Sequence, residues 1–350
     1  MELAEIRHKI DRIDYQLVKL LNDRMELALR TKSLKPQVLD EEREKKVMEN
    51  VNRFARGLVP DAFLTRIFTE LIAESKRLQG LEFRLIGFQG EHGANSEAAA
   101  RAYDPELLPI PCPEFTEVFA GVADRNIDLG ILPVENSLEG AVTEVNDLLI
   151  THHLKIVGEI KIPIHYCLLT LPETDYREIK VVYSHPQALA QCRKFIARNR
   201  LEARPFYDTA GAAKMIAESR SPAAAAIANR SSAEYYNLEI IKENIEDEST
   251  NSTRFLILSR ENGEADGDKC SIVFSTRHEA GALFHILRTF ADASINLTRI
   301  ESRPNKTDPG KYIFLLDFKG SPEEDNVRRV LEEVERKSVM YKFLGCYKEA

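Results

Sequence analysis

The sequence contains no block of like charge and no hydrophobic run near the roughly 20 residues of a membrane-spanning helix. Its formal net charge of −8 argues against nucleic acid or an anionic membrane as partner. The first residues are polar and charged, so no signal peptide is indicated and we expect a cytoplasmic protein. An acidic protein that handles anions must concentrate its cations locally.

The five cysteines are scattered and include no Cys-x-x-Cys pair. An odd number without that spacing indicates neither a disulfide framework nor a zinc or redox centre, so reduced core thiols are expected. Gly87, Gly90 and Gly93 lack the Gly-x-Gly-x-x-Gly spacing of dinucleotide-binding proteins. We therefore expect no metal and no cofactor. The length of 350 residues predicts two or three domains.

Residues 3–35 contain neither glycine nor proline, and their apolar residues recur in alternating steps of three and four. This spacing predicts a long helix with a coiled-coil seam. Arg24 occupies the next position of the seam, where an apolar side chain is expected. Glu44 and Ser75 interrupt the seams of two further predicted helices in the same way. The apolar residues of the first seam are Leu3, Ile6, Ile10, Ile13, Leu17 and Leu20.

Burying an unpaired charge costs several kcal/mol, so these polar groups must be satisfied by one another or by a ligand. One interpretation is a structural ion pair between Arg24 and Glu44. The other is a dianionic ligand, which would balance the additional cations Arg7, Lys35 and Arg43 near these seams. The first helix would be about 50 Å long. Two shorter helices of its own chain could not cover it, so we expect a helix-exchanged dimer.

This segment resembles the all-helical chorismate mutases over essentially all of residues 1–80. The resemblance implies a clamp for chorismate, whose rearrangement to prephenate needs charge stabilisation but no nucleophile, acid or base. Arginines would grip the two carboxylates, Lys35 and Gln79 would donate to the ether oxygen, and Glu44 would hold the ring hydroxyl. Arg7 would act in the neighbouring subunit. The implied clamp comprises Arg7, Arg24, Lys35, Asp40, Arg43, Glu44, Ser75 and Gln79.

Beyond Gly80, short apolar runs alternate with helical segments, a pattern that implies a parallel sheet with helices on its faces. Three motifs follow: Pro-Val-Glu-Asn-Ser with Glu-Gly in 133–140, Ser-His-Pro-Gln to Gln in 184–191, and Asn-Ser-Thr-Arg-Phe in 251–255. Together they resemble prephenate dehydratase over about residues 83–260. The resemblance implies two α/β lobes around a cleft, as in periplasmic binding proteins. The apolar runs are 83–88, 129–134, 156–160, 180–183, 223–227 and 255–258.

Dehydration of prephenate expels carbon dioxide and hydroxide together, so the enzyme must mainly assist the departure of hydroxide. The resemblance makes Thr253 essential, and a hydroxyl would donate a hydrogen bond to the departing oxygen rather than transfer its proton completely. Arg254 could bind a substrate carboxylate or serve the strand structurally. His185 could be a general acid or simply open a helix before its proline. The candidate dehydratase residues are Glu135, Asn136, Ser137, Ser184, His185, Gln187, Gln191, Thr253 and Arg254.

The glycine-rich turn departs from the pattern of the family it resembles. That pattern has proline after the second glycine and a hydroxyl residue after the third, where this chain has Glu91 and Ala94. Any substrate contact from that hydroxyl is absent here. Ser96 is the candidate to replace it.

After residues 261–269, the order strand, helix, strand, strand, helix, strand predicts a ferredoxin-like fold. This module resembles an ACT domain, and two of its segments resemble the phenylalanine-binding segments of dehydratase regulatory domains. Each segment has a structural alternative, because the first could open a helix and the second could end a strand. The segments are Gly281, Ala282, Leu283 and Phe284, and Glu301, Ser302, Arg303 and Pro304.

The sequence thus predicts a multidomain chain. Residues 1–80 form an all-α mutase domain, residues 83–260 a two-lobed α/β dehydratase domain, and residues 270–350 an α+β ferredoxin-like regulatory domain. The leading hypothesis is a bifunctional enzyme that acts on chorismate and prephenate, is inhibited by L-phenylalanine, and forms a homodimer or larger homo-oligomer. Two alternatives remain open. The cleft could take arogenate instead of prephenate, or the chain could be a non-catalytic amino-acid-binding regulator.

Overall fold

The computed structural model describes residues 3–31, 41–55, 57–172, 174–219, 221, 223–263, 267–306 and 308–350. The chain divides into two compact units, Met1–Phe83 and Arg84–Ala350. In the part of the chain that the structure describes, no helix is both long and apolar enough to cross a membrane. Of the five cysteines, four are buried, as expected for core thiols, and Cys346 is half-buried.

The first unit consists of helices in its described residues, as the periodicity predicted. They are α1 (Leu3–Arg30), α2 (Glu41–Phe54) and α3 (Asp61–Gln79). With 28 residues, α1 is about 42 Å long. The last turns of α1 pack on α3, whereas the apolar seam of its first 20 residues is between 41% and 63% exposed at each seam position. The seam is therefore uncovered by the described residues of its own chain.

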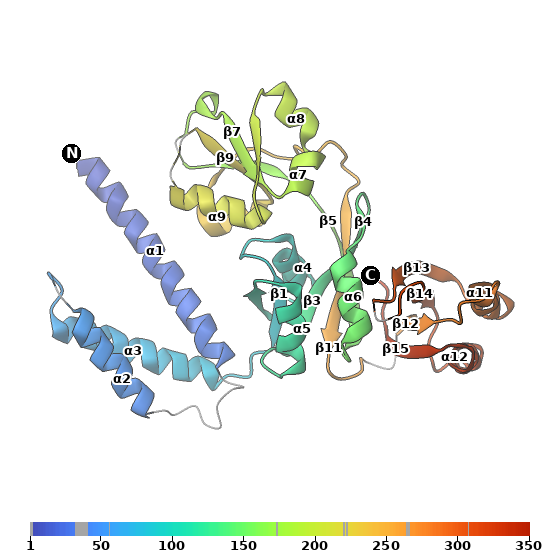
Figure 1. Ribbon diagram of the computed structural model, residues 1–350. Helices are drawn as coiled ribbons and strands as arrows, with labels where there is room; N and C mark the ends of the chain where they lie inside the picture. The colour runs from blue at the N-terminus through green and yellow to red at the C-terminus, as the bar shows by residue number, and fades with distance from the viewer. Residues whose placement is uncertain are drawn as a thin grey trace. The chain divides into compact units, whose positions relative to one another are not determined.

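The second unit begins with two α/β lobes, each built on its own sheet (Figure 1). The strands of the first lobe are β1 (Leu85–Gln89), β2 (Leu108–Cys112), β3 (Leu129–Asn136), β4 (Gly140–Ala141), β5 (Lys155–Pro163) and β11 (Ser252–Ser259). Those of the second lobe are β6 (Cys167–Thr170), β7 (Val181–Ser184), β8 (Glu202–Pro205), β9 (Ala224–Ala228) and β10 (Glu239–Lys242). The strand orders are β2-β1-β3-β11-β5, with β4 beside β3, and β10-β6-β9-β7-β8.

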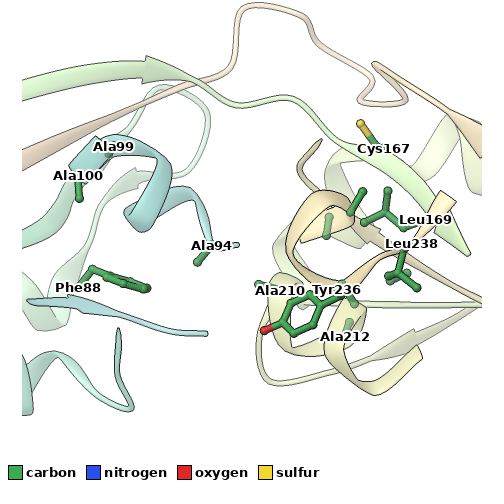
Figure 2. Packing of buried hydrophobic residues seen from close by; sticks show 14 of the residues in the cluster. Phe88, Ala94, Ala99, Ala100, Cys167, Leu169, Ala210, Ala212, Tyr236 and Leu238 are labelled. Carbon is green, nitrogen blue, oxygen red and sulfur yellow. The ribbon is translucent and has the colours of Figure 1, made fainter. Parts of the chain in front are cut away.

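Short helices connect these strands. They are α4 (Asn95–Tyr103), α5 (Phe115–Ala123), α6 (Thr143–Thr151), α7 (Pro186–Gln191), α8 (Arg193–Arg198), α9 (Thr209–Ser219) and α10 (Arg230–Tyr236), with a 3₁₀ turn at Tyr176–Glu178. A buried apolar core extends from one lobe to the other (Figure 2). Phe88 and Ala99 belong to the first lobe, and Leu169 and Ala210 to the second. Many of these side chains are alanines, which lets the elements approach closely.

The predicted parallel pairing is found in both lobes, but each sheet also contains antiparallel strands. Parallel pairs join β1 to β2 and β3, and β7 to β8 and β9. In contrast, β11 runs antiparallel to β3 and β5, and β6 runs antiparallel to β9 and β10. The reason is that β5 leaves the first lobe and β11 returns to it, so these strands run in opposite directions (Figure 1). The apolar runs did not reveal β2 and β8, because both are proline-containing edge strands.

The C-terminal module has the predicted order. It comprises β12 (Lys269–Ser275), α11 (Ala282–Asp292), β13 (Leu297–Pro304), β14 (Tyr312–Lys319), α12 (Asp325–Lys337) and β15 (Met340–Tyr347). Its antiparallel sheet has the order β13-β14-β12-β15, which is the ferredoxin-like arrangement. The module packs against the first lobe, where β15 lies beside β5. At Gly345, whose φ is +152°, an added Cβ would collide with the carbonyl oxygen of Ile156.

Glu97 on α4 anchors the glycine-rich turn between β1 and α4. Its carboxylate accepts hydrogen bonds from Gly93 N and Arg101 Nη2, both at 2.7 Å, and lies 3.3 Å from His92 Nδ1. Burial by itself raises the pKa of Glu97, but hydrogen bonds from His92, Gly93 and Arg101 lower that pKa to about 2. Gly93 has a φ of +83°, and a Cβ there would lie 2.8 Å from Ser232 Cα. The turn therefore needs both the glycine and the carboxylate.

Glu97→Gln is expected to lower the melting temperature of the dehydratase unit near neutral pH. The folded pKa of about 2 lies below the ordinary 4.5, so ionised Glu97 contributes stability above about pH 4.5 that is lost as the pH falls toward 2. This lowering of the pKa corresponds to a contribution of about 3 kcal/mol to the free energy of unfolding at neutral pH. Thermal unfolding of wild type and variant should differ most at neutral pH and converge on acidification. Glu117→Gln, an exposed first-turn glutamate of α5, is the control, and a Glu97→Gln difference that does not change with pH would contradict the assignment.

Candidate active sites

Arg24 is half-buried between α1 and α3 and faces other polar groups. Its Nη1 donates to Ser75 Oγ at 2.6 Å and to the Leu71 carbonyl oxygen at 3.3 Å. Burial, and then the positive charge of Arg43, lower the pKa of Arg24. The second helix therefore brings a second guanidinium to the same region, which is the arrangement that an anionic ligand requires.

The structural ion pair between Arg24 and Glu44 is not formed. Glu44 instead pairs with Lys76 Nζ at 2.6 Å. Nothing in the seam pattern singled out Lys76, because it lies one position beyond Ser75 and off the apolar stripe of α3. Gln79 is buried, and its Nε2 donates to the Ala28 carbonyl oxygen at 2.5 Å and to Thr31 Oγ1 at 2.9 Å.

The predicted clamp is only partly assembled within one chain. Arg7 is exposed and lies 17 residues before Arg24 on the same helix, about 25 Å along the axis. Lys35 and Asp40 lie outside the described residues. The residues that α1, α2 and α3 bring to one region are Arg24, Arg43, Glu44, Ser75 and Gln79.

A cavity of about 530 Å³ is lined by residues of both lobes of the second unit. Of the predicted dehydratase residues, the structure brings five to it: Asn136, His185, Gln187, Gln191 and Thr253. Further lining residues were not singled out from the sequence, including Gln89, Asn95, Tyr166, Tyr207, Asp208 and Thr209.

Asn136 fixes the hydroxyl of Thr253. The two residues are Cα partners of the neighbouring strands β3 and β11, and Asn136 Nδ2 donates to Thr253 Oγ1 at 2.9 Å. Asn136 Oδ1 accepts from the backbone N–H groups of Leu138 and Glu139, at 3.0 and 3.1 Å, so the amide orientation is determined. A threonine hydroxyl that accepts one hydrogen bond keeps its own proton for another acceptor. Thr253 is therefore prepared to donate into the cavity.

A polar chain continues from this pair across the lobes. Asn136 Nδ2 also donates to Asn251 Oδ1 at 2.8 Å. Asn251 Nδ2 donates to Gln191 Oε1 at 2.8 Å, and Gln191 Nε2 donates to Glu139 Oε1 at 3.2 Å. Because Gln191 belongs to α7 of the second lobe, lobe position and the Asn136–Thr253 pair are linked.

His185 is the N-cap of α7, which agrees with the interpretation that it opens a helix before its proline. Its Nδ1 accepts from the backbone N–H of Gln187 at 3.3 Å, as a helix N-cap does. The ring also lines the cavity. Its part in catalysis stays a prediction.

The charged side chains that line the cavity are carboxylates, whereas backbone N–H groups give parts of its wall a partial positive charge. The described residues that line it include no lysine or arginine but two carboxylates, Glu139 and Asp208. Burial raises the pKa of Asp208, whose Oδ1 accepts from Gly211 N at 2.7 Å. Residues of the first turns of α4 and α6 also line the cavity, and the N-cap residues of these helices, Ala94 and Val142, make no side-chain capping hydrogen bond to a described residue. Uncapped helix N-termini attract anions.

The interpretation of Arg254 as a ligand for a substrate carboxylate is corrected by the structure. Successive residues of a strand point to opposite faces, so Arg254 faces away from the cavity that Thr253 lines. Its guanidinium binds Glu159 at 2.8 Å and Asp317 of β14 at 2.6 Å. Burial alone would lower the pKa of Arg254, but the carboxylates, Asp317 foremost, raise it above its ordinary value. Arg254 is the structural residue of the two alternatives.

Three further candidates lie outside the cavity. Glu135, the neighbour of Asn136, lies on the Arg254 side, with its Oε2 3.6 Å from Arg254 Nε. Ser137 Oγ accepts from Ser252 N at 3.0 Å and so joins the residue after β3 to the first residue of β11. Ser184 is fully buried and donates to the Ile227 carbonyl oxygen at 2.5 Å. These three residues were predicted because they are adjacent in sequence to site residues, but none of their side chains lines the cavity.

Glu91, which replaces the expected proline, joins the lobes. It accepts from Tyr207 Oη at 2.8 Å and pairs with Lys214 Nζ at 2.9 Å. Ala94 and Ser96 both line the cavity. The Ser96 hydroxyl therefore lies where it could replace the hydroxyl that Ala94 lacks.

The two candidate regulatory segments adopt the predicted local structures. Gly281 is the N-cap of α11 with a φ of +83°, and β13 ends at Pro304. Phe284 is 60% exposed. Arg303 Nε donates to Asp147 of α6 at 2.9 Å, so this segment contacts the first lobe. Phenylalanine binding by these segments stays a prediction.

A helical unit, a two-lobed α/β unit with a polar cleft, and a ferredoxin-like module define a multifunctional enzyme with a regulatory domain. Family models for chorismate mutase type II, prephenate dehydratase and the ACT domain match residues 6–80, 86–263 and 271–336. A bifunctional chorismate mutase/prephenate dehydratase of Aquifex aeolicus (strain VF5) is 34% identical over 360 residues, covering 100% of this chain and 98% of the relative. The chain belongs to this bifunctional family and is a chorismate mutase and a prephenate dehydratase in one polypeptide.

Other similar proteins cover the second unit. Arogenate dehydratase 3 of Arabidopsis thaliana is 40% identical over 283 residues, 75% of this chain and 66% of that protein. Among solved structures, GqqA, titled a quorum quenching acylase, has 35% identity and a TM-score of 0.72 over 76% of this chain and 98% of its own. A prephenate dehydratase from Arthrobacter aurescens in complex with L-Phe has 32% identity and a TM-score of 0.71 over 76% and 90%. The alternative of a non-catalytic regulator is set aside.

Proposed function

We propose that the enzyme converts chorismate to phenylpyruvate in two steps, at separate sites, and that L-phenylalanine inhibits it. The proposed domains are residues 1–80, 83–260 and 270–350. The observation that carries the proposal is the hydrogen bond from Asn136 to Thr253 at the wall of the lobe cavity. A second support is the cluster of Arg24, Arg43 and Glu44 in the helical unit.

In the dehydratase site, Thr253 donates a hydrogen bond to the ring hydroxyl of prephenate. As the C–O bond breaks, negative charge develops on the departing oxygen and this hydrogen bond strengthens, while the ring carboxylate leaves as carbon dioxide. Asn136 holds the lone pair of Thr253 and so aims its proton. His185, Gln187 and Gln191 complete the polar wall. The uncapped first turns of α4 and α6 bind the two carboxylates.

In the mutase site, the clamp holds chorismate in the compressed conformer that rearranges. Arg24 binds one carboxylate, and Ser75 orients its guanidinium through the 2.6 Å hydrogen bond. Gln79 and Lys35 donate to the ether oxygen. Glu44, with Arg43 and Asp40 at the start of the second helix, holds the rest of the ring.

The mutase site is completed by a second copy of the chain. Arg7 lies too far from Arg24 along α1 to share a ligand with it, and the apolar seam of the same helix is more than one third exposed throughout. A helix-exchanged homodimer covers that seam and brings Arg7 of the second copy to Arg24. Larger homo-oligomers are compatible with this dimer. We propose a cytoplasmic enzyme without metal or cofactor, since the chemistry at both sites uses only hydrogen bonds and charge.

Arogenate is a second candidate substrate for the cleft. It carries an ammonium group where prephenate has a keto group, and the cavity presents Glu139 and Asp208 with no lysine or arginine among its described lining residues. A carboxylate beside an ammonium favours arogenate. Comparing kcat/KM for the two substrates on one preparation decides between them.

A coupled assay tests the proposal as a whole. With chorismate supplied, purified full-length protein is expected to form phenylpyruvate, and L-phenylalanine is expected to lower that rate while leaving chorismate consumption largely unchanged. Titration calorimetry should show phenylalanine binding at the segments that contain Gly281 and Glu301. Tyrosine serves as the control ligand. Absence of phenylpyruvate would contradict the dehydratase assignment, and absence of binding heat would contradict the regulatory one.

A further inference from the structure

The strands that carry the catalytic pair present a second pair of side chains on the opposite face of the sheet. Thr253 and Asn136 are Cα partners that line the cavity, and the preceding register pair, Arg254 and Glu135, turns toward the C-terminal domain. The register of the two strands shifts between Arg254 and Phe255. Any displacement of the Arg254 backbone therefore displaces Thr253, its immediate neighbour.

Arg254 is held by carboxylates of two domains. Its Nη1 donates to Glu159 of β5 at 2.8 Å, and its Nη2 donates to Asp317 of the C-terminal domain at 2.6 Å. All three side chains are almost fully buried, with exposed fractions of 11%, 2% and 4% for Arg254, Glu159 and Asp317. The third donor, Nε, makes no hydrogen bond with any described residue and stands 3.6 Å from Glu135 Oε2.

The C-terminal domain fixes the far side of this network. Asp317 Oδ1 accepts from Ser271 Oγ at 2.7 Å, and that hydroxyl lies 2.7 Å from Tyr347 Oη. Lys269 Nζ donates to Glu159 at 2.9 Å. Buried ions with several shared partners have little freedom to move singly. The sheet of the C-terminal domain thus determines where the Arg254 guanidinium lies.

The network also adjoins the second candidate regulatory segment, residues 301–304. Arg299 of β13 is the Cα partner of Asp317, with its Nη1 3.9 Å from Asp317 Oδ2, and Glu301 follows two residues later on that strand. A change at the end of β13 acts on Asp317 through this pairing. The path from the segment to Thr253 runs through one strand pair and one ion pair.

We propose that Arg254 is a positioning residue for Thr253, held by the C-terminal domain through Asp317, so that an amino-acid effector acts on hydroxide departure through this ion pair. The proposal rests on the proposed role of Thr253. It assigns to the arginine of the Thr-Arg-Phe triplet a task in coupling rather than in substrate binding. A shift of about 1 Å in a catalytic group lowers turnover on the order of 10²-fold, so small motions of Arg254 suffice.

The test uses the full-length Asp317→Asn variant, which keeps the side-chain size and removes the charge. Its dehydratase kcat with prephenate is expected to fall at least about tenfold, with KM changed less than about twofold, because substrate contacts are untouched. Saturating phenylalanine should still bind in calorimetry, yet the ratio of kcat without and with phenylalanine should approach one. The mutase rate of the same sample is the internal control.

Lys342→Met is the matched control for general weakening of the domain contact. Lys342 is a partly buried cation of β15 that donates to the carbonyl oxygens of Leu149 and His152 in the first lobe, away from Arg254. This variant is expected to keep the wild-type kcat and the wild-type inhibition ratio. If it matches the loss of Asp317→Asn, or if Asp317→Asn behaves as wild type, the proposal is overturned.

Ser271→Ala covers the case in which Asp317→Asn does not fold. It leaves the charges in place and removes the hydroxyl that donates to Asp317 and contacts Tyr347 Oη. The dehydratase kcat and the inhibition ratio should therefore fall partially in a protein that still unfolds cooperatively, with a melting temperature lowered by the lost buried contacts. Wild-type values for both would overturn the proposal. The proposed function is tested separately by Thr253 variants, since their retained activity contradicts the role of Thr253 whatever Asp317 does.

Discussion

Thr253→Ala is expected to lower dehydratase turnover by roughly 10²- to 10⁴-fold, the usual effect of losing a positioned proton donor. The hydroxyl accepts from Asn136 and has its proton free for the substrate, so its removal leaves the departing hydroxide without its stabilising hydrogen bond. Phenylpyruvate formation from prephenate is the measurement. Chorismate consumption by the same preparation should not change, because the mutase site lies in the helical unit.

Two further substitutions at the same position separate the hydroxyl from the packing. Thr253→Val keeps the branched shape and removes only the oxygen, so it should be as inactive as alanine. Thr253→Ser keeps the oxygen and should retain a large part of the turnover. The assignment fails if the valine variant remains active, or if the serine and valine variants lose turnover equally.

Arg24→Ala is expected to reduce mutase turnover by at least roughly 10²-fold, since one charged donor to a transition state accounts for an effect of this size. Dehydratase activity with prephenate supplied directly should persist. Arg77→Ala is a matched control, because that guanidinium is exposed and pairs only with its helix neighbour Glu74 among the described residues. If the role of Arg24 were purely structural, Arg24→Ala would instead lower the melting temperature and leave the mutase turnover of the folded protein unchanged.

Mixing two inactive variants tests the exchanged dimer. If Arg7 acts in the partner's site, an Arg7→Ala and Arg24→Ala heterodimer contains one site with both arginines and one with neither. After denaturation and refolding of an equal mixture, half of the dimers are mixed, so about one quarter of the sites regain activity. No recovery in the mixture would contradict an action of Arg7 in trans.

The helices of the first unit were predictable because each repeats its apolar residues with helical period over several turns. The partner of each charge was not. Lys76 pairs with Glu44, and Arg24 with Ser75, because side-chain reach across packed helices decides between nearby cations. Sequence spacing along one helix does not contain that information.

In the dehydratase domain, the six apolar runs predicted β1, β3, β5, β7, β9 and β11, whereas the buried strand β6 was missed. Strand direction was missed because it follows from the crossover between the lobes. Motif adjacency also misled the assignment of Glu135 and Arg254, although the alternation of side chains along a strand was a usable signal. With Thr253 and Asn136 predicted to face the cleft, this alternation places their neighbours Arg254 and Glu135 on the other face of the sheet.

The sequence by itself determined the family, the order of the three domains and the residue types available for each reaction, because motifs and periodicity are local properties. Only the tertiary structure decided which side chains meet. It turned Arg254 to Asp317, set Asn136 on the hydroxyl of Thr253 and left the seam of α1 exposed. These contacts join residues tens to more than a hundred positions apart, and packing between elements is what selects them.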